Sequence, residues 1–139
     1  MSFLIDTNVL SELRKGSRCD RNVADWFGGI AEADIFLSVL TIGELRRGVD
    51  LIRRRDAKSA SHLNDWLRGI TDIHQDRILP VDRAIAEEWG RMCVARPLPV
   101  IDGLLAATAK VHGLCLVTRN TRDIAGTGVD HLDPFVSKG

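Results

Sequence analysis

The chain has 139 residues, 45% of them apolar, and its 19 basic side chains balance 19 acidic ones. This length and composition predict a single domain, residues 1–139, around one hydrophobic core. A formal net charge of zero disfavours a protein that coats nucleic acid through overall charge, but not one that grips it through a local patch.

No apolar run approaches the roughly 20 residues that cross a bilayer, and we expect no secretion signal at the start of the chain. The three cysteines are far apart and form no CxxC pair, which is typical of buried thiols in a reducing cytosol. We therefore expect a cytoplasmic protein that makes no contact with a membrane.

Short apolar runs alternate with amphipathic helices along the chain. Apolar residues at helical spacing predict helices that include 41–58 and 100–112, and Gly113 provides a normal end for the second. The apolar runs predict strands at residues 3–6, 35–39, 77–81, 114–118 and 129–132. Strands that alternate with helices indicate an α/β fold, with a short, mostly parallel sheet of about five strands and helices on both faces.

Four acidic residues stand at the edges of these apolar segments: Asp6, Glu44, Asp102 and Asp123. Carboxylates are rarely placed inside a protein unless they are paired or bound to a metal. In parallel α/β sheets, ligands bind beyond the carboxyl ends of the strands, and all four acids can meet at that edge. The pattern therefore predicts a site for a divalent cation.

Each acid also has a purely structural explanation when it is taken alone. Glu44 can complete a capping box with Thr41, and Asp102 can complement a helix dipole. Asp6 can cap the following helix, and Asp123 can form an Asx-turn. Asp102 is the hardest to explain in this way, because it is the only charged side chain on its apolar helix before position 110.

Four segments carry a family resemblance, in order and over nearly the whole chain. Residues 4–12 (LIDTNVLSE), 38–48 (SVLTIGELRRG), 101–102 followed by a helix of small residues, and 116–124 (LVTRNTRDI) resemble the four acidic motifs of the PIN-domain family. More narrowly, they look like the VapC/FitB-type toxins of bacterial type II toxin–antitoxin pairs. The resemblance implies a PIN-like three-layer sandwich and an Mg²⁺-dependent endoribonuclease, in which Mn²⁺ can replace Mg²⁺.

Carried over position by position, the resemblance makes Asp6, Glu44, Asp102 and Asp123 the catalytic and metal-binding residues. It gives two further residues, Thr118 and Asn120, a role in supporting the fourth acid. The chemistry agrees, because hydrolysis of a phosphodiester needs an activated water and help for a leaving alkoxide. A hard cation with oxygen ligands supplies both, and whether one or two ions bind stays open.

A non-catalytic alternative is a PIN-fold regulator that binds an antitoxin and so contributes to operator binding. A complete acidic quartet favours the enzyme, since a scaffold has no reason to cluster like charges. The expected partners are an RNA substrate and a cognate antitoxin, with operator DNA reached only through the antitoxin. We also expect a homodimer, partly because a small domain has many amphipathic faces to cover, including that of Leu63, Trp66, Leu67 and Ile70.

Two arginines follow Glu44 closely in the sequence, at positions 46 and 47. A helix advances by about 100° per residue, so Arg47 is predicted to share a face with Glu44 while Arg46 points away. Both are candidate contacts for substrate phosphates, and Arg47 is the stronger one. A solvated helix face is the plainer explanation for the other basic residues of this segment.

Overall fold

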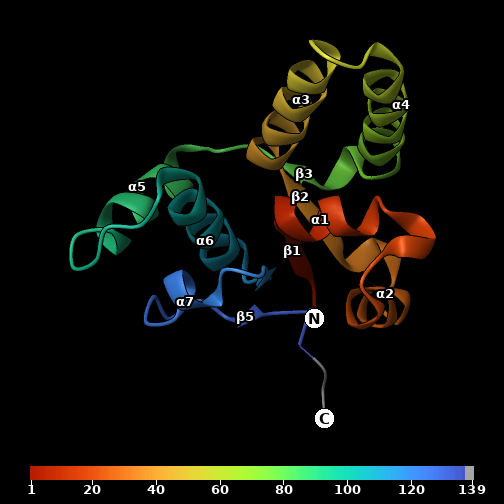
Figure 1. The fold of residues 1–139 in the computed structure, drawn as a ribbon. Helices are drawn as coiled ribbons and strands as arrows, with labels where there is room; N and C mark the ends of the chain where they lie inside the picture. Colours follow the sequence, from red (N-terminus) through yellow and green to blue (C-terminus); the bar gives the residue numbers. More distant parts are fainter. Residues whose placement is uncertain (137–139) are drawn as a thin grey trace.

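A computed structural model describes residues 1–136 as a five-stranded sheet with helices on both faces (Figure 1). The strand order is β3-β2-β1-β4-β5, and every neighbouring pair is parallel. The strands are β1 (Phe3–Ile5), β2 (Ile35–Ser38), β3 (Ile78–Leu79), β4 (Cys115–Val117) and β5 (His131–Leu132). All five predicted strands are confirmed in place, although each is shorter than its apolar run.

Seven α-helices and three short 3-10 turns connect the strands. The helices are α1 (Thr7–Leu13), α2 (Arg21–Gly28), α3 (Val39–Arg53), α4 (Ala57–Ile73), α5 (Arg83–Met92), α6 (Val100–His112) and α7 (Thr121–Ile124). The 3-10 turns are η1 (Gly16–Arg18), η2 (Glu32–Asp34) and η3 (Gln75–Arg77). Helix α6 confirms the predicted bounds and ends at Gly113, whose φ of 66° is in the left-handed region that favours glycine.

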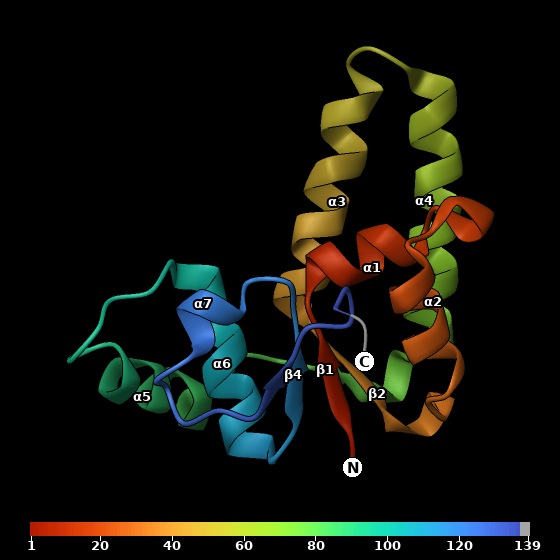
Figure 2. The ribbon, with the colours of Figure 1, turned by 60° about the horizontal axis from the view of Figure 1, so that its bottom comes forward.

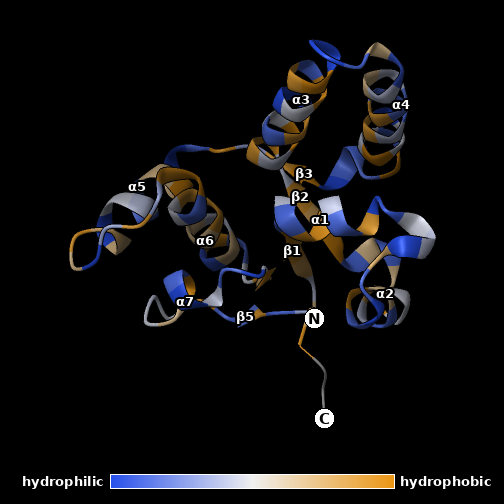
Figure 3. Cartoon of the chain, in the orientation of Figure 1, coloured by the Kyte–Doolittle hydropathy of each residue, from blue (hydrophilic) through white to orange (hydrophobic). Residues whose placement is uncertain are grey.

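The sheet separates two hydrophobic clusters, because successive strand residues point to opposite faces. Leu4 and Leu116 pack with α6, α7 and their loops, whereas Ile5, Leu37 and Val117 pack with α1 to α4. Figure 3 shows hydrophobic residues along the central strands and hydrophilic ones where α3 joins α4. The result is the expected three-layer α/β sandwich.

Helices α3 and α4 form an antiparallel hairpin that extends away from the sheet (Figures 1 and 2). The prediction of one helix over 41–58 is wrong at both ends. Helix α3 begins at Val39, because Ser38 accepts a hydrogen bond from the backbone N–H of Leu40, and α4 begins after the cap Asp56. Thr41 is buried in the first turn and does not serve as the cap.

The apolar face of α4 is covered by the chain's own core. Leu63 and Leu67 are buried, and Trp66 and Ile70 are half-buried against the same cluster. The expectation that this face needs a second protein to cover it is therefore wrong, and homodimer formation stays a prediction on other grounds. No helix among residues 1–136 has the length and hydrophobicity to cross a membrane.

Candidate active site

Asp6 lies at the carboxyl end of β1, where the chain turns into α1, and only 6% of its surface is exposed. Its backbone N–H donates to the carbonyl of Val117 on β4, which continues the parallel ladder by one residue. Its carboxylate accepts hydrogen bonds from the N–H of Thr7 at 2.7 Å and from the hydroxyl of Thr118 at 2.8 Å. The amide of Asn8 donates to the same carboxylate at 3.4 Å.

Burial raises the pKa of Asp6 above the ordinary aspartate value. The hydrogen bonds from Thr118 and Thr7 act in the opposite direction, because they stabilise the charged form. The negative charge of Glu44 raises the pKa further. The fold therefore holds the Asp6 carboxylate in one orientation, while burial and the charge of Glu44 disfavour its ionised form.

Glu44 comes from the second turn of α3, and the hydroxyl of Thr7 on α1 donates to it. The capping-box explanation for Glu44 is therefore wrong, since Ser38 caps the helix. The hydroxyl of Thr41 is buried and has no hydrogen-bond partner among residues 1–136. The contact between Thr7 and Glu44 ties the start of α1, next to Asp6, to the start of α3.

Asp102 and Asp123 lie in the first turns of α6 and α7. Burial raises the pKa of Asp102, and the charges of Asp6, Asp123 and Glu44 raise it further. Asp102 therefore lies close enough to feel the charges of the other three predicted acids, although the four come from four separate segments of the chain. Figure 2 shows the start of α1, the start of α3 and α7 around the ends of β1 and β4.

The quartet does not form a closed ligand shell. Within the described range 1–136, no three His, Cys, Asp or Glu side chains are placed to hold one cation together. The donors nevertheless fit a hard divalent cation, because all of them are carboxylate oxygens.

Of the two predicted supporting residues, Thr118 contacts Asp6 and not Asp123. The backbone N–H of Asn120 donates to the Thr118 hydroxyl at 3.1 Å and so helps to orient it. The sequence interpretation missed Thr7 and Asn8, which hold Glu44 and Asp6. Their only signal is that they directly follow Asp6 in the first motif.

An arginine joins the two segments that carry the third and fourth acids. Arg96, in the loop before α6, donates to the carbonyl of Ala125 at 3.0 Å and to that of Arg122 at 3.3 Å. These carbonyls belong to the end of α7, the helix of Asp123. The loop that leads to Asp102 is therefore hydrogen-bonded to the segment of Asp123.

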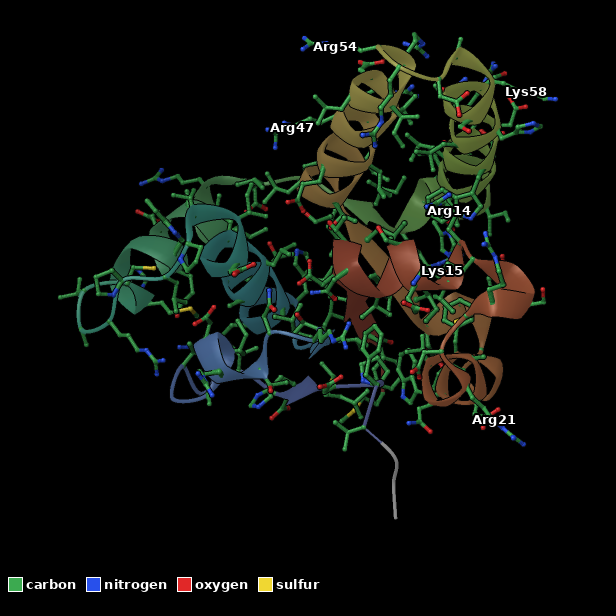
Figure 4. All side chains as sticks on the ribbon, in the orientation of Figure 1. Arg14, Lys15, Arg21, Arg47, Arg54 and Lys58 are labelled. Atoms are coloured by element: carbon green, nitrogen blue, oxygen red, sulfur yellow. The ribbon has the colours of Figure 1, made fainter. Side chains whose placement is uncertain are left out.

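The two arginines near Glu44 point in different directions. The guanidinium of Arg46 donates to the side chain of Asn64 on α4 at 2.6 Å. Arg47 projects from the side of α3 that is turned away from α4 (Figure 4). The two guanidinium groups therefore point to different sides of α3. The face that Arg47 is expected to share with Glu44, and contact of either arginine with a substrate, stay predictions.

Comparison with known proteins agrees with this geometry. Residues 3–128 match the model of the PIN domain. The chain belongs to the PIN-domain family. This PIN-domain protein is 32% identical over 138 residues to the toxin FitB of Neisseria gonorrhoeae, an alignment that covers 96% of the chain and 98% of FitB. It is 30% identical over 139 residues to the VapC ribonuclease Y4jK of Sinorhizobium fredii, covering 96% and 97% of the two chains.

Solved structures extend the similarity to three dimensions. The PIN-domain protein superposes on a chain of the crystal structure of FitAcB from Neisseria gonorrhoeae with a TM-score of 0.87 and 31% identity, covering 96% of this chain and 98% of that one. For a chain in the structure of FitAB bound to an IR36 DNA fragment, the TM-score is 0.89 and the identity 28%, with 99% and 98% covered.

Proposed function

We propose that this PIN-domain protein is an Mg²⁺-dependent endoribonuclease and the toxin of a type II toxin–antitoxin pair. The observation that carries the proposal is the electrostatic coupling of Asp6, Glu44, Asp102 and Asp123 around one edge of the sheet. A structural scaffold has no use for a buried Asp6 and an Asp102 whose pKa values are raised by the carboxylates around them. Similarity to FitB and to the ribonuclease Y4jK supports the same activity and a cognate antitoxin as partner.

In the proposed site, Asp6 and Asp102 hold the cation directly, and Glu44 and Asp123 do so directly or through water. A bound Mg²⁺ or Mn²⁺ supplies an activated water and stabilises the leaving alkoxide. The protein's own part is to fix the donors. Thr118 and the N–H of Thr7 orient the carboxylate of Asp6, and the Thr7 hydroxyl holds Glu44 beside it.

A second candidate function is that of a non-catalytic regulator that reaches operator DNA through an antitoxin. It is favoured by one finding, the close structural match to a chain in a FitAB complex that is bound to DNA. The two functions are compatible in one protein, but only the enzyme explains the acidic quartet. Cleavage of RNA by protein freed of any antitoxin separates the two.

The test compares Asp6→Asn and Asp102→Asn with Asp65→Asn, an exposed aspartate on α4. Each site variant loses one charged oxygen donor, so we expect RNA cleavage in Mg²⁺ to fall at least about 100-fold. Asp65→Asn should cleave like the wild type, and far-UV circular dichroism should be unchanged in all three. Normal cleavage by either site variant would refute the metal-site assignment.

If wild-type protein with Mg²⁺ or Mn²⁺ fails to cleave structured RNA but still binds an antitoxin, the regulator is the better explanation. Chelation with EDTA provides the matched control on the same protein sample. We expect EDTA to stop cleavage and added Mg²⁺ to restore it. Cleavage that persists in EDTA would contradict metal dependence.

A further inference from the structure

A line of residues runs along the outer side of α3, beginning at the proposed active site. Glu44, Arg47, Leu51 and Arg54 follow one another at intervals of three and four residues, which places them on one stripe of a helix and its C-cap. Figure 4 shows that Arg47 and Arg54 both project on the side away from α4. The stripe therefore leads from the acidic quartet toward the tip of the α3–α4 hairpin.

A shallow depression of about 430 Å³, called the α3 groove below, lies on the surface of α3 along much of this stripe. Its lining residues all belong to α3 and its C-cap: Gly43, Arg46, Arg47, Asp50, Leu51 and Arg54. Leu51 is 47% exposed in the middle of the groove and offers apolar surface there. Gly43 has no Cβ, and a Cβ built there would meet nothing within 4 Å, so the end near Glu44 is open.

Some charged side chains of the groove have a partner within the protein, and others do not. Arg46 donates a hydrogen bond to Asn64, and Asp50 forms an exposed ion pair with Arg53 at 2.6 Å. Arg47 and Arg54, by contrast, make no ion pair and no side-chain hydrogen bond within residues 1–136. Two guanidinium groups are thus free to bind an anion that enters the groove.

An anionic strand needs such groups at this place. Four carboxylates repel a phosphodiester backbone, and nearby cations offset the repulsion. Arg47 lies one helical turn beyond Glu44, and Arg54 lies about 10 Å further along the helix axis, since a helix rises roughly 1.5 Å per residue. A strand that follows α3 can therefore offer a different phosphate to each arginine.

We propose that the α3 groove is the path of the RNA strand on one side of the scissile bond, with Arg47 and Arg54 binding two different phosphates of that strand. Leu51, between them, offers an apolar surface to a sugar or base. The proposal rests on the proposed ribonuclease function. It adds the direction in which the substrate leaves the site and the length of strand that the protein grips.

Direct measurements of RNA binding test the proposed path of the strand without requiring cleavage. The parent protein is Asp102→Asn in EDTA, and the probe is a fluorescein-labelled 12-nucleotide single-stranded RNA of mixed sequence, followed by fluorescence anisotropy. Arg47→Ala and Arg54→Ala are made in this parent. Arg21→Ala, an exposed arginine at the start of α2 and far from the groove in Figure 4, is the control.

Each lost phosphate contact should reduce the slope of log affinity against log salt by about 0.7 for a single strand. Between 50 and 200 mM salt, the gap between the parent and each groove variant should therefore narrow by about 2.6-fold, and by about 7-fold for the double variant. Arg21→Ala should retain the parent slope. Arg46→Ala should weaken binding less than Arg47→Ala, because Asn64 already holds its guanidinium.

Two results would overturn the inference: groove variants that bind RNA with the affinity and salt slope of Arg21→Ala, or a parent that binds the probe no better than an unrelated neutral protein. Either result is separable from failure of the proposed function, which is measured by cleavage with the wild-type aspartates and Mg²⁺. Melting curves of all variants verify that loss of binding does not reflect loss of folding.

Discussion

Replacing Thr118 by valine keeps the shape of a side chain that is 1% exposed but removes the hydroxyl that donates to Asp6 at 2.8 Å. Hydrogen bonds to charged groups contribute roughly 1.5–3 kcal/mol, and Asp6 keeps only its bond from the Thr7 N–H and a long one from Asn8. We therefore expect Thr118→Val to lower the free energy of unfolding by about 2 kcal/mol at pH 7 in EDTA, as measured by urea denaturation.

The cost of this substitution should depend on pH. Because the Thr118 bond lowers the pKa of Asp6, its loss raises that pKa further and penalises the ionised form. As the pH falls and Asp6 takes up a proton, the lost bond becomes one between neutral groups, worth roughly 0.5–1.5 kcal/mol. The difference in unfolding free energy between variant and wild type should therefore shrink on acidification.

Thr108→Val is the matched control, since Thr108 is also fully buried but donates to the neutral carbonyl of Leu104 in its own helix. Its effect should be smaller at pH 7 and should not change with pH. Equal costs for the two substitutions at pH 7, with equal pH dependence, would refute the view that Thr118 serves the charge of Asp6.

Two further predictions concern the metal-free protein and its assembly. Burial and mutual repulsion raise the pKa values of Asp6 and Asp102, so the folded state binds their protons more tightly than the unfolded state. The contribution of these two groups to stability in EDTA should be most favourable below the ordinary carboxyl pKa and should fall as the pH rises through the raised values. In urea titrations Asp102→Asn should flatten this fall, and Mg²⁺ should raise its melting temperature less than that of the wild type. In sedimentation at micromolar concentration we expect a homodimer, since Val39 and Val100 expose apolar surface, and a purely monomeric profile would contradict this.

The order of strands and helices could be predicted from the sequence because apolar runs and helical spacing are local signals. The exact ends of these strands and helices could not be predicted as well. The predicted strand 77–81 is only Ile78–Leu79, because η3 precedes it and Pro80 follows without an N–H for the ladder. The break between α3 and α4 carries no proline or glycine, and only the capping side chain of Asp56 marks it.

The electrostatic convergence of the acids follows from topology. Asp6 directly follows β1, and Glu44 and Asp123 lie on the helices that follow its two parallel neighbours, β2 and β4. Their hydrogen-bond partners could not be predicted in the same way. Thr118 reaches Asp6 because Ile5 pairs with Val117, and the register of two strands is not written in either strand alone. The contact of Thr7 with Glu44 depends on the packing of α1 against α3.

The pairing of β1 with β4 also affects when the acidic quartet can form during synthesis. Asp6 and Thr118 are 112 positions apart in the chain, so Asp6 leaves the ribosome long before its hydroxyl partner has been made. Parallel strands joined across so long a segment pair slowly, because the chain entropy is lost before the contact is gained. A growing chain therefore carries the first two acids without the last two. Under the proposed function, the nuclease cannot cleave the RNA of the ribosome or the message that produces it until β4 and α7 have been added.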